Sequence, residues 1–538
     1  MPLNLNLPVS TRVLAKDFET NPKKIKIWVE SLPLTKTVVA GKQLYDFLEN
    51  VNRAKFSADE RLEFIDTITP ILCVVFEELE AIYAYSSLPM PTRQLDAFQL
   101  ARKLASECAY TYKLVLMERS GKLLKFNAKK NIGPNLYRAA YYAAAQILQC
   151  YKTYHPVPAG VWAELHQLFG FAEDSDLVNE PVEFINENQR AAQSKTTLGE
   201  VYVETCLVSL ADPYRLMFKE VDRVQEVLSR NRAMVDFRND SEGANPNELF
   251  VIALDGDQAP KPVIQGTRAA SGGTVLRILE TKRLIERLKQ RAQPGSNSNN
   301  ASLAQSRATH DMTDLIQRLL RLWGDPPKRQ FRRNPASATL ALCSGIKGIA
   351  YFAERELEQT ITEDDSAVYE GGVTMPLLTI PQDEAAKAVG VDEWQVLNQS
   401  ANGLRLHRKQ GGTVAVTVGE AVGVRFIGGR TWNMGVVRWL TLLEGDALEF
   451  GLELVSPAAS GVTIEPTIGS GGRAMPALLL VPPHSETESD EILTLPDTFS
   501  DLREFTINDH GREYKVRATT LMERTSKFDL FQFTPTKN

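Results

Sequence analysis

Apolar positions in the first part of the chain recur with the period of a helix. Leu44, Phe47, Leu48 and Val51 stand at i, i+3, i+4 and i+7, the spacing that gathers side chains on one helix face. Similar patterns predict further helices over 58–85, 92–116, 135–154, 161–171, 186–208 and about 213–229. There is no strict repeat of about 34 or 40 residues, which argues against a regular solenoid. We therefore predict an irregular helical domain over residues 1–232, with an irregular lead-in over residues 1–40.

The pattern changes after residue 232. Leu249–Leu254 and Val275–Leu279 are short apolar runs, which predict strands. The basic stretch Lys282–Gln293 that follows them has the period of a helix. These elements predict a small α/β lobe over residues 233–293.

Residues 294–327 separate this lobe from the strand-rich remainder of the chain. Pro294–Ser302 combines chain breakers with small polar residues and contains no apolar anchor, which is typical of a linker. Asp311–Trp323 then has its apolar residues on one side and predicts an amphipathic helix. Gly324–Pro327 ends that helix, since proline cannot continue it.

The C-terminal part of the chain is rich in strand signals. β-Branched content predicts strands at 339–343, 413–418 and 422–426. The runs 394–397 and 404–406 are strand-like as well. Short strands with Gly-rich turns favour a small barrel or sandwich over residues 328–460. Residues 461–538 add more strand-like runs and a hairpin turn at Asn508–Gly511. The fold class is therefore α+β multidomain, with a mostly helical N-terminal half, a β-barrel and a further small C-terminal β-unit.

Composition narrows the class of protein. The chain has 538 residues, 43% hydrophobic and 24% charged, the values of a globular protein with several domains. Its formal net charge of −6 argues against general nucleic-acid binding, which needs a basic field. No apolar run is long enough to span a bilayer, and the N-terminus has no signal-peptide pattern. Five widely spaced cysteines without a Cys-x-x-Cys motif predict buried, reduced thiols and a cytoplasmic location.

No constellation in the sequence indicates catalysis. The six histidines show no metal-ligand spacing, and Walker, Rossmann and Gly-x-Ser-x-Gly motifs do not occur. Acidic pairs such as Asp364-Asp365 have the context of solvated helix faces. We therefore predict a protein that is not an enzyme and that holds no metal or cofactor.

Two polar stretches remain as candidates for ligand binding. Lys328–Arg333 places four cations within six residues, and Asn398–Gly403 is a polar turn between two predicted strands. Arginine offers a planar fork for phosphate and stacks on flat rings, and glycine permits a positive φ or close approach. Taken alone, the first stretch also fits a solvated linker or a phosphate-contacting arm. The second also fits an Asx or Ser turn.

Together, these stretches resemble the two signatures of the PilZ family, which binds cyclic di-GMP. The signature Arg-x-x-x-Arg is matched by Arg329 and Arg333, and Arg332 could take the place of Arg333. The signature Asp/Asn-x-Ser-x-x-Gly is matched by Asn398, Ser400 and Gly403. Downstream, 434–439 and 449–454 are similar to the last strands of a PilZ barrel. The resemblance covers roughly residues 325–460.

The resemblance implies a cyclic di-GMP receptor whose barrel binds the nucleotide and whose helical half signals to a protein partner. Motility, pilus or polysaccharide machinery is the output that it suggests, and nothing excludes a homo-oligomer. One departure from the family is the long segment between Arg333 and Asn398, which predicts an insertion on the barrel surface. Two alternatives remain: an interaction scaffold that has lost nucleotide binding, and an unrecognised enzyme in the helical half.

Three further residues lie near the proposed pocket in sequence. Arg405 and Arg438 follow alternating strand patterns that could aim either side chain outward. For Trp439 we favour a place in the core over a ligand-stacking role, because large aromatic residues are highly buried on average.

Overall fold

The computed structural model describes residues 5–9, 13–14, 18–120, 128–183, 195–238, 244–263, 275–292, 303–324, 334–353, 390–408, 411–429, 431–443, 447–467, 474–481 and 490–536. The chain divides into two compact units. The first consists of Met1–Ser86, Met90–Pro213 and Lys219–Lys328, and the second of Ser87–Pro89, Tyr214–Phe218 and Arg329–Asn538.

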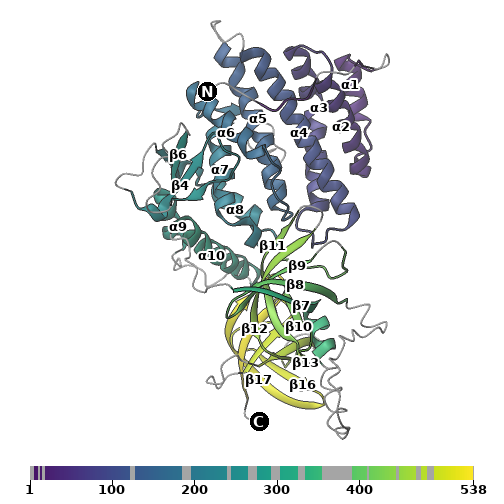
Figure 1. Cartoon of the computed structure of the whole chain (residues 1–538), viewed down its shortest axis with the longest axis vertical. Coiled ribbons are helices and arrows are strands. Elements are labelled where there is room, and N and C mark those ends of the chain that lie inside the picture. The colour runs from purple at the N-terminus through teal and green to yellow at the C-terminus, as the bar shows by residue number, and fades with distance from the viewer. Residues whose placement is uncertain are drawn as a thin grey trace. The chain divides into compact units, whose positions relative to one another are not determined.

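The first unit is built mainly from helices (Figure 1). Their bounds are α1 Pro22–Glu30, α2 Thr37–Arg53, α3 Ala58–Tyr83, α4 Thr92–Ser120, α5 Ala128–Tyr151, α6 Val161–Asp174, α7 Leu198–Leu210 and α8 Glu220–Ser229. Short 3-10 turns lie at Leu34–Lys36, Pro213–Arg215, Arg232–Met234 and Pro246–Glu248, and a two-stranded ladder joins β1 Val182–Glu183 to β2 Lys195–Thr196. The predicted helical N-terminal half is confirmed.

Capping residues set several helix starts. Ser57 and Thr197 each form a capping box at the N-terminus of α3 and α7, which satisfies amide groups that the helix leaves without partners. Asn21 caps α1 directly before Pro22. The prediction of an irregular segment up to residue 40 is therefore wrong for α1 and for the start of α2. The same cap-and-proline signal at Asp212-Pro213 gives only a 3-10 turn, and α8 starts at Glu220.

Small side chains let the central helices approach each other closely. The alanine-rich face of α5 is fully buried, with Ala139 and Ala140 both at 0% exposure. Tyr142 of α5 stacks on Tyr112 of α4 with ring centroids 6.1 Å apart. Helices α4 and α5 therefore share a closely packed, buried face.

The cysteines are free thiols, four of them buried and Cys73 half-buried. Burial raises the pKa of Cys150 to about 11 and that of Cys343 to about 12. Both groups therefore stay protonated at neutral pH, as expected for cysteines that pack as small apolar residues.

A four-stranded sheet with a helix lies in the first unit, within the range predicted as an α/β lobe. Its antiparallel order is β3-β6-β4-β5, from β3 Asp236–Arg238, β4 Leu249–Ala253, β5 Lys261–Pro262 and β6 Leu276–Glu280, followed by α9 Lys282–Ala292. The carboxylate of Asp257 accepts hydrogen bonds from the amides of Gly160 and Ala163 at the start of α6. Buried His166 contacts the carbonyl oxygen of Gln258 at 2.9 Å. The lobe is thus tied to helix α6.

Helix α10, Leu303–Gly324, ends the first unit. Its Trp323 is fully buried, and the indole Nε1 donates to the carbonyl oxygen of Leu207 at 3.2 Å. The hydroxyl of Thr281 donates to the carbonyl oxygen of Trp323 at 2.6 Å. The end of α10 is therefore fixed to this unit. The linker predicted at 294–302 lies outside the described residues.

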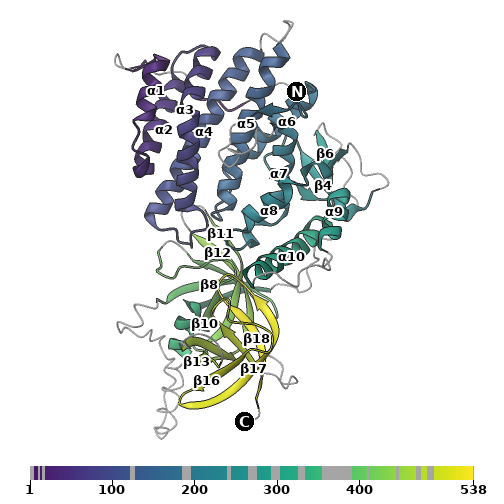
Figure 2. The same ribbon diagram turned by 180° about the vertical axis from the view of Figure 1, so that it is seen from behind.

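The second unit contains two closed six-stranded barrels, which Figure 2 shows from behind. The first closes in the order β10-β11-β12-β9-β8-β7. Its strands are β7 Asn334–Ser344, β8 Asp392–Gln399, β9 Gly403–Arg408, β10 Ala421–Phe426, β11 Asn433–Leu442 and β12 Leu448–Ser456. Leu340, Trp394, Leu406 and Phe450 point inward at 0–1% exposure, and the Trp394 and Phe450 rings meet edge to face.

One predicted strand of this barrel is wrong. Residues 413–418 alternate as a strand would, and Val414 and Val416 are buried, but they form a loop. Val416 pairs only with Leu88, in an isolated antiparallel bridge. The amides of Thr413 and Val414 instead donate to the carboxylate of Asp392. The alternating pattern of residues 413–418 therefore reflects the burial of the valine side chains and not strand pairing.

The further C-terminal β-unit is the second closed barrel. Its strands are β13 Ala459–Pro466, β14 Met475–Leu480, β15 Asp490–Thr494, β16 Glu504–Asp509, β17 Arg512–Arg524 and β18 Asp529–Pro535. The predicted hairpin turn is confirmed, with His510 and Gly511 at φ 49° and 89°. The α+β multidomain fold class is confirmed as well.

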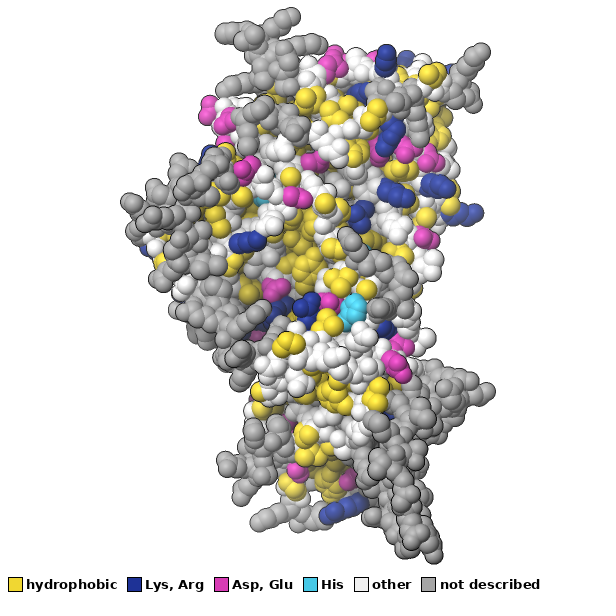
Figure 3. Space-filling model, viewed as in Figure 1, with side chains coloured by type: hydrophobic (Ala, Val, Ile, Leu, Met, Phe, Trp, Pro, Cys, Tyr) yellow, Lys and Arg dark blue, Asp and Glu magenta, His cyan; other side chains and the backbone are white. Residues whose placement is uncertain are grey.

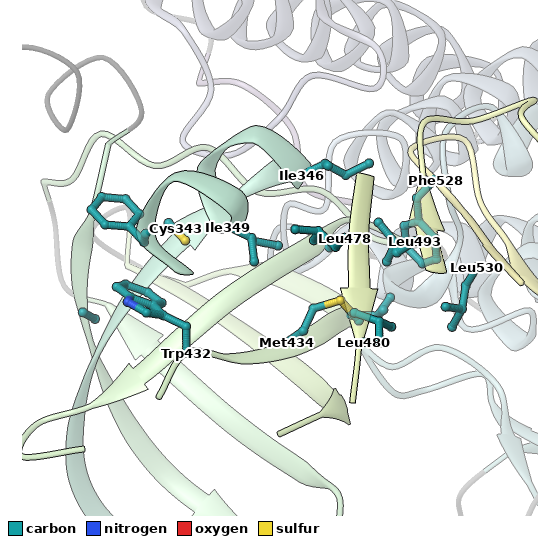
Figure 4. Packing of buried hydrophobic residues seen from close by; sticks show 14 residues of the cluster. Cys343, Ile346, Ile349, Trp432, Met434, Leu478, Leu480, Leu493, Phe528 and Leu530 are labelled. Atoms are coloured by element: carbon teal, nitrogen blue, oxygen red, sulfur yellow. The ribbon is translucent and has the colours of Figure 1, made fainter. Parts of the chain in front are cut away.

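One apolar cluster is shared by the two barrels (Figure 4). Met434 of the first barrel packs with Leu478, Leu493 and Phe528 of the second, all at 0% exposure. A helical stretch over residues 345–353, which the sequence patterns did not predict, contributes to the same cluster. The barrels therefore pack as one body within the second unit.

Candidate functional site

The corner between β8 and β9 is a tight polar turn. The amide of Ser400 donates to the carbonyl oxygen of Gly403 at 2.8 Å, and the Ser400 hydroxyl lies 3.4 Å from the same oxygen. The carbonyl oxygen of Asn402 accepts from the amide of Leu454 in β12 at 2.8 Å. This turn is therefore fixed on both sides by backbone hydrogen bonds.

Gly403 lies in a tight space but has no unusual backbone angle. It is absent from the glycines with positive φ. A Cβ at this position would lie 3.1 Å from the Ser400 hydroxyl and 3.4 Å from the carbonyl oxygen of Leu452. The left-handed conformation therefore does not account for glycine at this position, and close approach to a ligand stays a prediction.

Asn398 lies on the outer face of the first barrel. A bulge between Val396 and Asn398 shifts the register, so that Asn398 pairs with Arg405 of β9. Val396 is buried at 1% exposure, whereas Asn398 is half-buried. Bulges commonly re-aim a side chain next to a functional site. Here the bulge turns Asn398 to the same side as Arg405.

The three arginines predicted as ligands, Arg329, Arg332 and Arg333, lie outside the described residues. Strand β7, which directly follows them, is described. At the first residue of β7, Asn334 pairs with Gln399, and Pro335 pairs with Asn398. The chain therefore leaves the arginine stretch next to the 398–403 corner.

The long segment between the two motifs does not separate their strands. β7 and β8 pair directly, and the far end of this ladder is Leu342 opposite Asp392. The segment that connects β7 to β8 is therefore attached at the end of the ladder that is opposite the 398–403 corner. The insertion predicted on the barrel surface covers residues outside those that the structure describes, apart from the helical stretch 345–353.

A buried ion pair holds the far end of this ladder. Arg408 and Asp392 pair at 8% and 9% side-chain exposure, and the guanidinium lies over the Trp394 ring at 4.6 Å. Burial lowers the pKa of Arg408, and the Asp392 carboxylate opposes this shift. Gly412 at φ 120° leaves room for the pair, because a Cβ there would overlap both charged groups.

Two arginines near the corner, Arg405 and Arg438, are paired with acidic side chains. Arg405 donates through Nε to Glu449 at 3.0 Å, and His407 Nδ1 lies 3.7 Å from the same carboxylate. Arg438 is held by Glu453 and by Glu523 of the second barrel. Burial lowers the pKa of Arg438, but the bonds to these two carboxylates outweigh it and the net direction is upward.

Trp439 is not in the barrel core, which corrects the sequence-based expectation. It pairs with Gly451 of β12 and is half-buried, while Phe450 beside Gly451 is the residue that points inward. A bulge between Val437 and Trp439 determines that Trp439 lies on the outer face of the barrel. This bulge has no signature in the sequence. Arg405 could have been placed outward from the alternation Leu404-Arg405-Leu406 alone.

Comparison with known protein families decides the identity. A model described as the cyclic-di-GMP receptor FimW N-terminal domain matches residues 23–241. The model of the FimW middle PilZ domain matches 249–372 and 378–461, and that of the FimW C-terminal beta-barrel domain matches 461–536. The chain belongs to the FimW family of PilZ-domain proteins. The PilZ resemblance is thereby confirmed.

A curated relative supports the same assignment over the whole length. The cyclic-di-GMP receptor FimW of Pseudomonas aeruginosa is 23% identical over 583 residues, which cover 99% of this chain and 93% of the relative. Both polar motifs fall within the matched ranges of the middle PilZ model. The FimW family is described as one of receptors, which is not a class of enzymes.

Two simple structural criteria, those of a metal cluster and of a membrane-spanning helix, apply to the described part of this FimW-family chain. Its residues include no group of three or more His, Cys, Asp or Glu side chains that could hold a metal ion. No described helix has the length and hydropathy needed to cross a bilayer. Cationic and acidic side chains are interspersed over the face shown in Figure 3.

Proposed function

We propose that this chain is a cyclic di-GMP receptor that signals through its helical N-terminal domain to a protein partner. The residues that we propose to bind cyclic di-GMP are Arg329, Arg332, Arg333, Asn398, Ser400 and Gly403. The relative from Pseudomonas aeruginosa carries the same receptor description, and the second motif in this chain is a rigid turn on a closed barrel.

The pairing of β7 with β8 is the observation that carries this proposal. Asn334 lies opposite Gln399, and Arg333 is covalently bonded to Asn334. Consecutive Cα atoms are about 3.8 Å apart, so the first signature reaches the second without crossing the insertion. A single ligand in contact with both motifs is therefore compatible with the chain's connectivity.

The chemistry of the two motifs suits a cyclic dinucleotide of guanine. Arginine forks bind phosphate oxygens bidentately and also match the O6 and N7 acceptors of guanine. The Asn398 amide and the Ser400 hydroxyl supply a donor and acceptors for the polar edge of a base. Gly403 keeps the turn close enough for the backbone to approach the ligand.

Transmission to the helical domain would pass through the segment that contains the arginines. On one side of this segment, Trp323 is fixed within the first unit by two hydrogen bonds. On the other side, β7 is the first strand of the first barrel. A ligand that binds the arginines binds one of the chain segments that join the two units, and it shifts their arrangement if its affinity differs between arrangements.

Isothermal titration calorimetry of the intact protein with cyclic di-GMP tests the receptor function. We expect saturable binding, with no comparable heat for cyclic di-AMP at the same concentrations. Absence of binding by folded protein would reject the receptor function and favour an interaction scaffold.

A further inference from the structure

Helix α9, Lys282–Ala292, combines a buried apolar side with an exposed basic side. Five of its eleven residues are cationic and one is acidic. Leu284, Ile285 and Leu288 are buried at 2% exposure or less, whereas each of the cationic residues is exposed. The whole chain has a formal net charge of −6. Helix α9 is therefore a local concentration of positive charge on a chain that is acidic overall.

The three arginines of α9 form a row along the helix. Arg283, Arg287 and Arg291 stand at i, i+4 and i+8, and residues four apart are neighbours on a helix surface. With a rise of about 1.5 Å per residue, the row advances in steps of about 6 Å. Like charges at this spacing destabilise a helix. The row therefore does not serve the stability of α9 itself.

Most of this row has no carboxylate partner within the chain. Elsewhere in the first unit arginines commonly pair with acidic side chains, and Arg277 does so with Glu173 at 3.0 Å. Arg283, in the first turn of α9, also reaches a carboxylate, that of Asp236 in β3, at 3.2 Å. Arg287 and Arg291 form no ion pair with any residue that the structure describes. Their charges are therefore available to another molecule.

Helix α9 is fixed to the end of α10. A Cβ at Gly324 would lie 2.6 Å from Cδ1 of Ile285, so the two helices pack closely at this point. The hydroxyl of Thr281, directly before α9, donates to the carbonyl oxygen of Trp323 at 2.6 Å. Figures 1 and 2 both show α9 beside α10. The basic row therefore belongs to the helix pair from which the chain continues to the proposed nucleotide-binding arginines.

The geometry of the row suits an acidic helix. Arginine forks bind carboxylates bidentately, and a facing helix with Asp or Glu at i, i+4 and i+8 repeats the same step of about 6 Å. A bilayer suits it less well. Amphipathic helices that lie in a membrane bury their apolar side there, and the apolar side of α9 is already buried within the protein.

We propose that α9 is a docking surface for an acidic helix of a protein partner, which it recognises through Arg283, Arg287 and Arg291. This proposal rests on the protein-partner part of the proposed function, and it gives the chemistry of that partner. The partner meets the first unit at the helix pair that leads into the nucleotide-binding segment.

Fluorescence anisotropy of the intact protein with a synthetic peptide tests this surface. The probe is a labelled helical peptide of about 20 residues, rich in alanine and glutamine, with glutamate at i, i+4 and i+8. We expect saturable binding at low ionic strength that weakens as salt is added, because salt screens exposed charges. An isomeric peptide whose glutamates point to different sides of the helix should bind more weakly.

Charge reversal provides the decisive variant. In the double variant Arg287→Glu, Arg291→Glu we expect binding of the glutamate peptide to fall at least roughly tenfold, about 1.4 kcal/mol. The same variant should gain binding of a peptide with lysine in place of glutamate. The matched control Lys23→Glu, Arg93→Glu reverses two exposed cations on other helices and should bind the glutamate peptide as wild type does. Thermal unfolding checks that each variant is folded.

The outcomes separate this proposal from the receptor function, since calorimetry with cyclic di-GMP is carried out on the same proteins. If folded wild type binds cyclic di-GMP but not the glutamate peptide, or if the control variant weakens peptide binding equally, the docking surface is wrong and the receptor function stands. If wild type binds the peptide but no cyclic di-GMP, the receptor function is wrong and the surface stands.

Vesicles that contain phosphatidylglycerol test the competing occupant. Binding to these vesicles that is lost in Arg287→Glu, Arg291→Glu, without binding of the glutamate peptide, would overturn the proposal, because the row would then recognise lipid phosphate. Absence of vesicle binding, with the peptide bound, supports the acidic helix.

Discussion

At the scale of single residues, the site depends on small groups in tight places. Gly403 and Gly451 both have backbone angles open to other residues, yet each has a neighbour where a Cβ would stand. The neighbour is a hydroxyl at Gly403 and an indole at Gly451. Glycine is needed at these positions because of the groups that lie beside it.

Gly403→Ala therefore should affect binding more than stability. The added methyl group would lie 3.1 Å from the Ser400 hydroxyl and would push it by a few tenths of an ångström. We expect a loss of roughly 0.5–1 kcal/mol of stability and at least a tenfold loss in cyclic di-GMP affinity, measured by thermal unfolding and calorimetry. At Gly428 nothing lies within 4 Å but φ is 80°, so Gly428→Ala should affect stability more than cyclic di-GMP affinity. Unchanged affinity in Gly403→Ala would contradict the role given to Ser400.

The sequence reveals these residues unequally. The motif Asn-x-Ser-x-x-Gly identifies the corner, and alternation places Arg405 outward. The positions of Asn398 and Trp439 depend on two bulges, and a bulge leaves no periodic signal because it breaks the period. The face of the sheet on which Asn398 and Trp439 lie is determined by the register of each strand with its neighbour in the barrel.

At the scale of elements, the β7–β8 ladder keeps the two motifs together despite the insertion. Its far end is held by the buried pair of Asp392 and Arg408 and by amides of the 413–414 loop. The sequence predicted most strands here, but it assigned 413–418 to a strand. Valines buried by a loop alternate as strand valines do, so hydrophobic pattern alone cannot separate the two.

Removal of one partner of this pair should destabilise the first barrel. In Asp392→Ala, Arg408 stays buried without its carboxylate, and two backbone amides lose their acceptor. We expect a loss of about 3–5 kcal/mol in the free energy of unfolding, measured by urea unfolding. Glu393→Ala, exposed on the same strand, should change stability by less than about 0.5 kcal/mol. Equal small effects in both variants would show that the ion pair does not hold this end.

At the scale of the whole molecule, the chain passes for the last time from the first unit to the second at the arginine stretch. This passage falls between Lys328 and Arg329, within a run that offers trypsin four basic residues. Hydrophobic periodicity was sufficient to find the helical half and the β-rich half. It could not show that the C-terminal half holds two closed barrels, because closure depends on which strands pair.

Limited trypsin digestion probes the arginine segment, one of the links between the units. We expect cyclic di-GMP to slow cleavage at Lys328, Arg329, Arg332 and Arg333, with fragments near residues 1–328 and 334–538 quantified by mass spectrometry. The ligand should give no protection in Ser400→Ala, which keeps every cleavage site. Equal cleavage with and without ligand, in wild-type protein that binds it, would place the arginines outside the binding site.

The central claim is that both motifs contact one ligand, and calorimetry of matched variants tests it most directly. We predict that wild type binds cyclic di-GMP, that Arg329→Ala and Ser400→Ala each weaken binding at least roughly tenfold, as loss of a charge-assisted hydrogen bond implies, and that Arg512→Ala on the second barrel leaves affinity unchanged. The same affinity in all four folded proteins would contradict the account, because the nucleotide would then bind elsewhere.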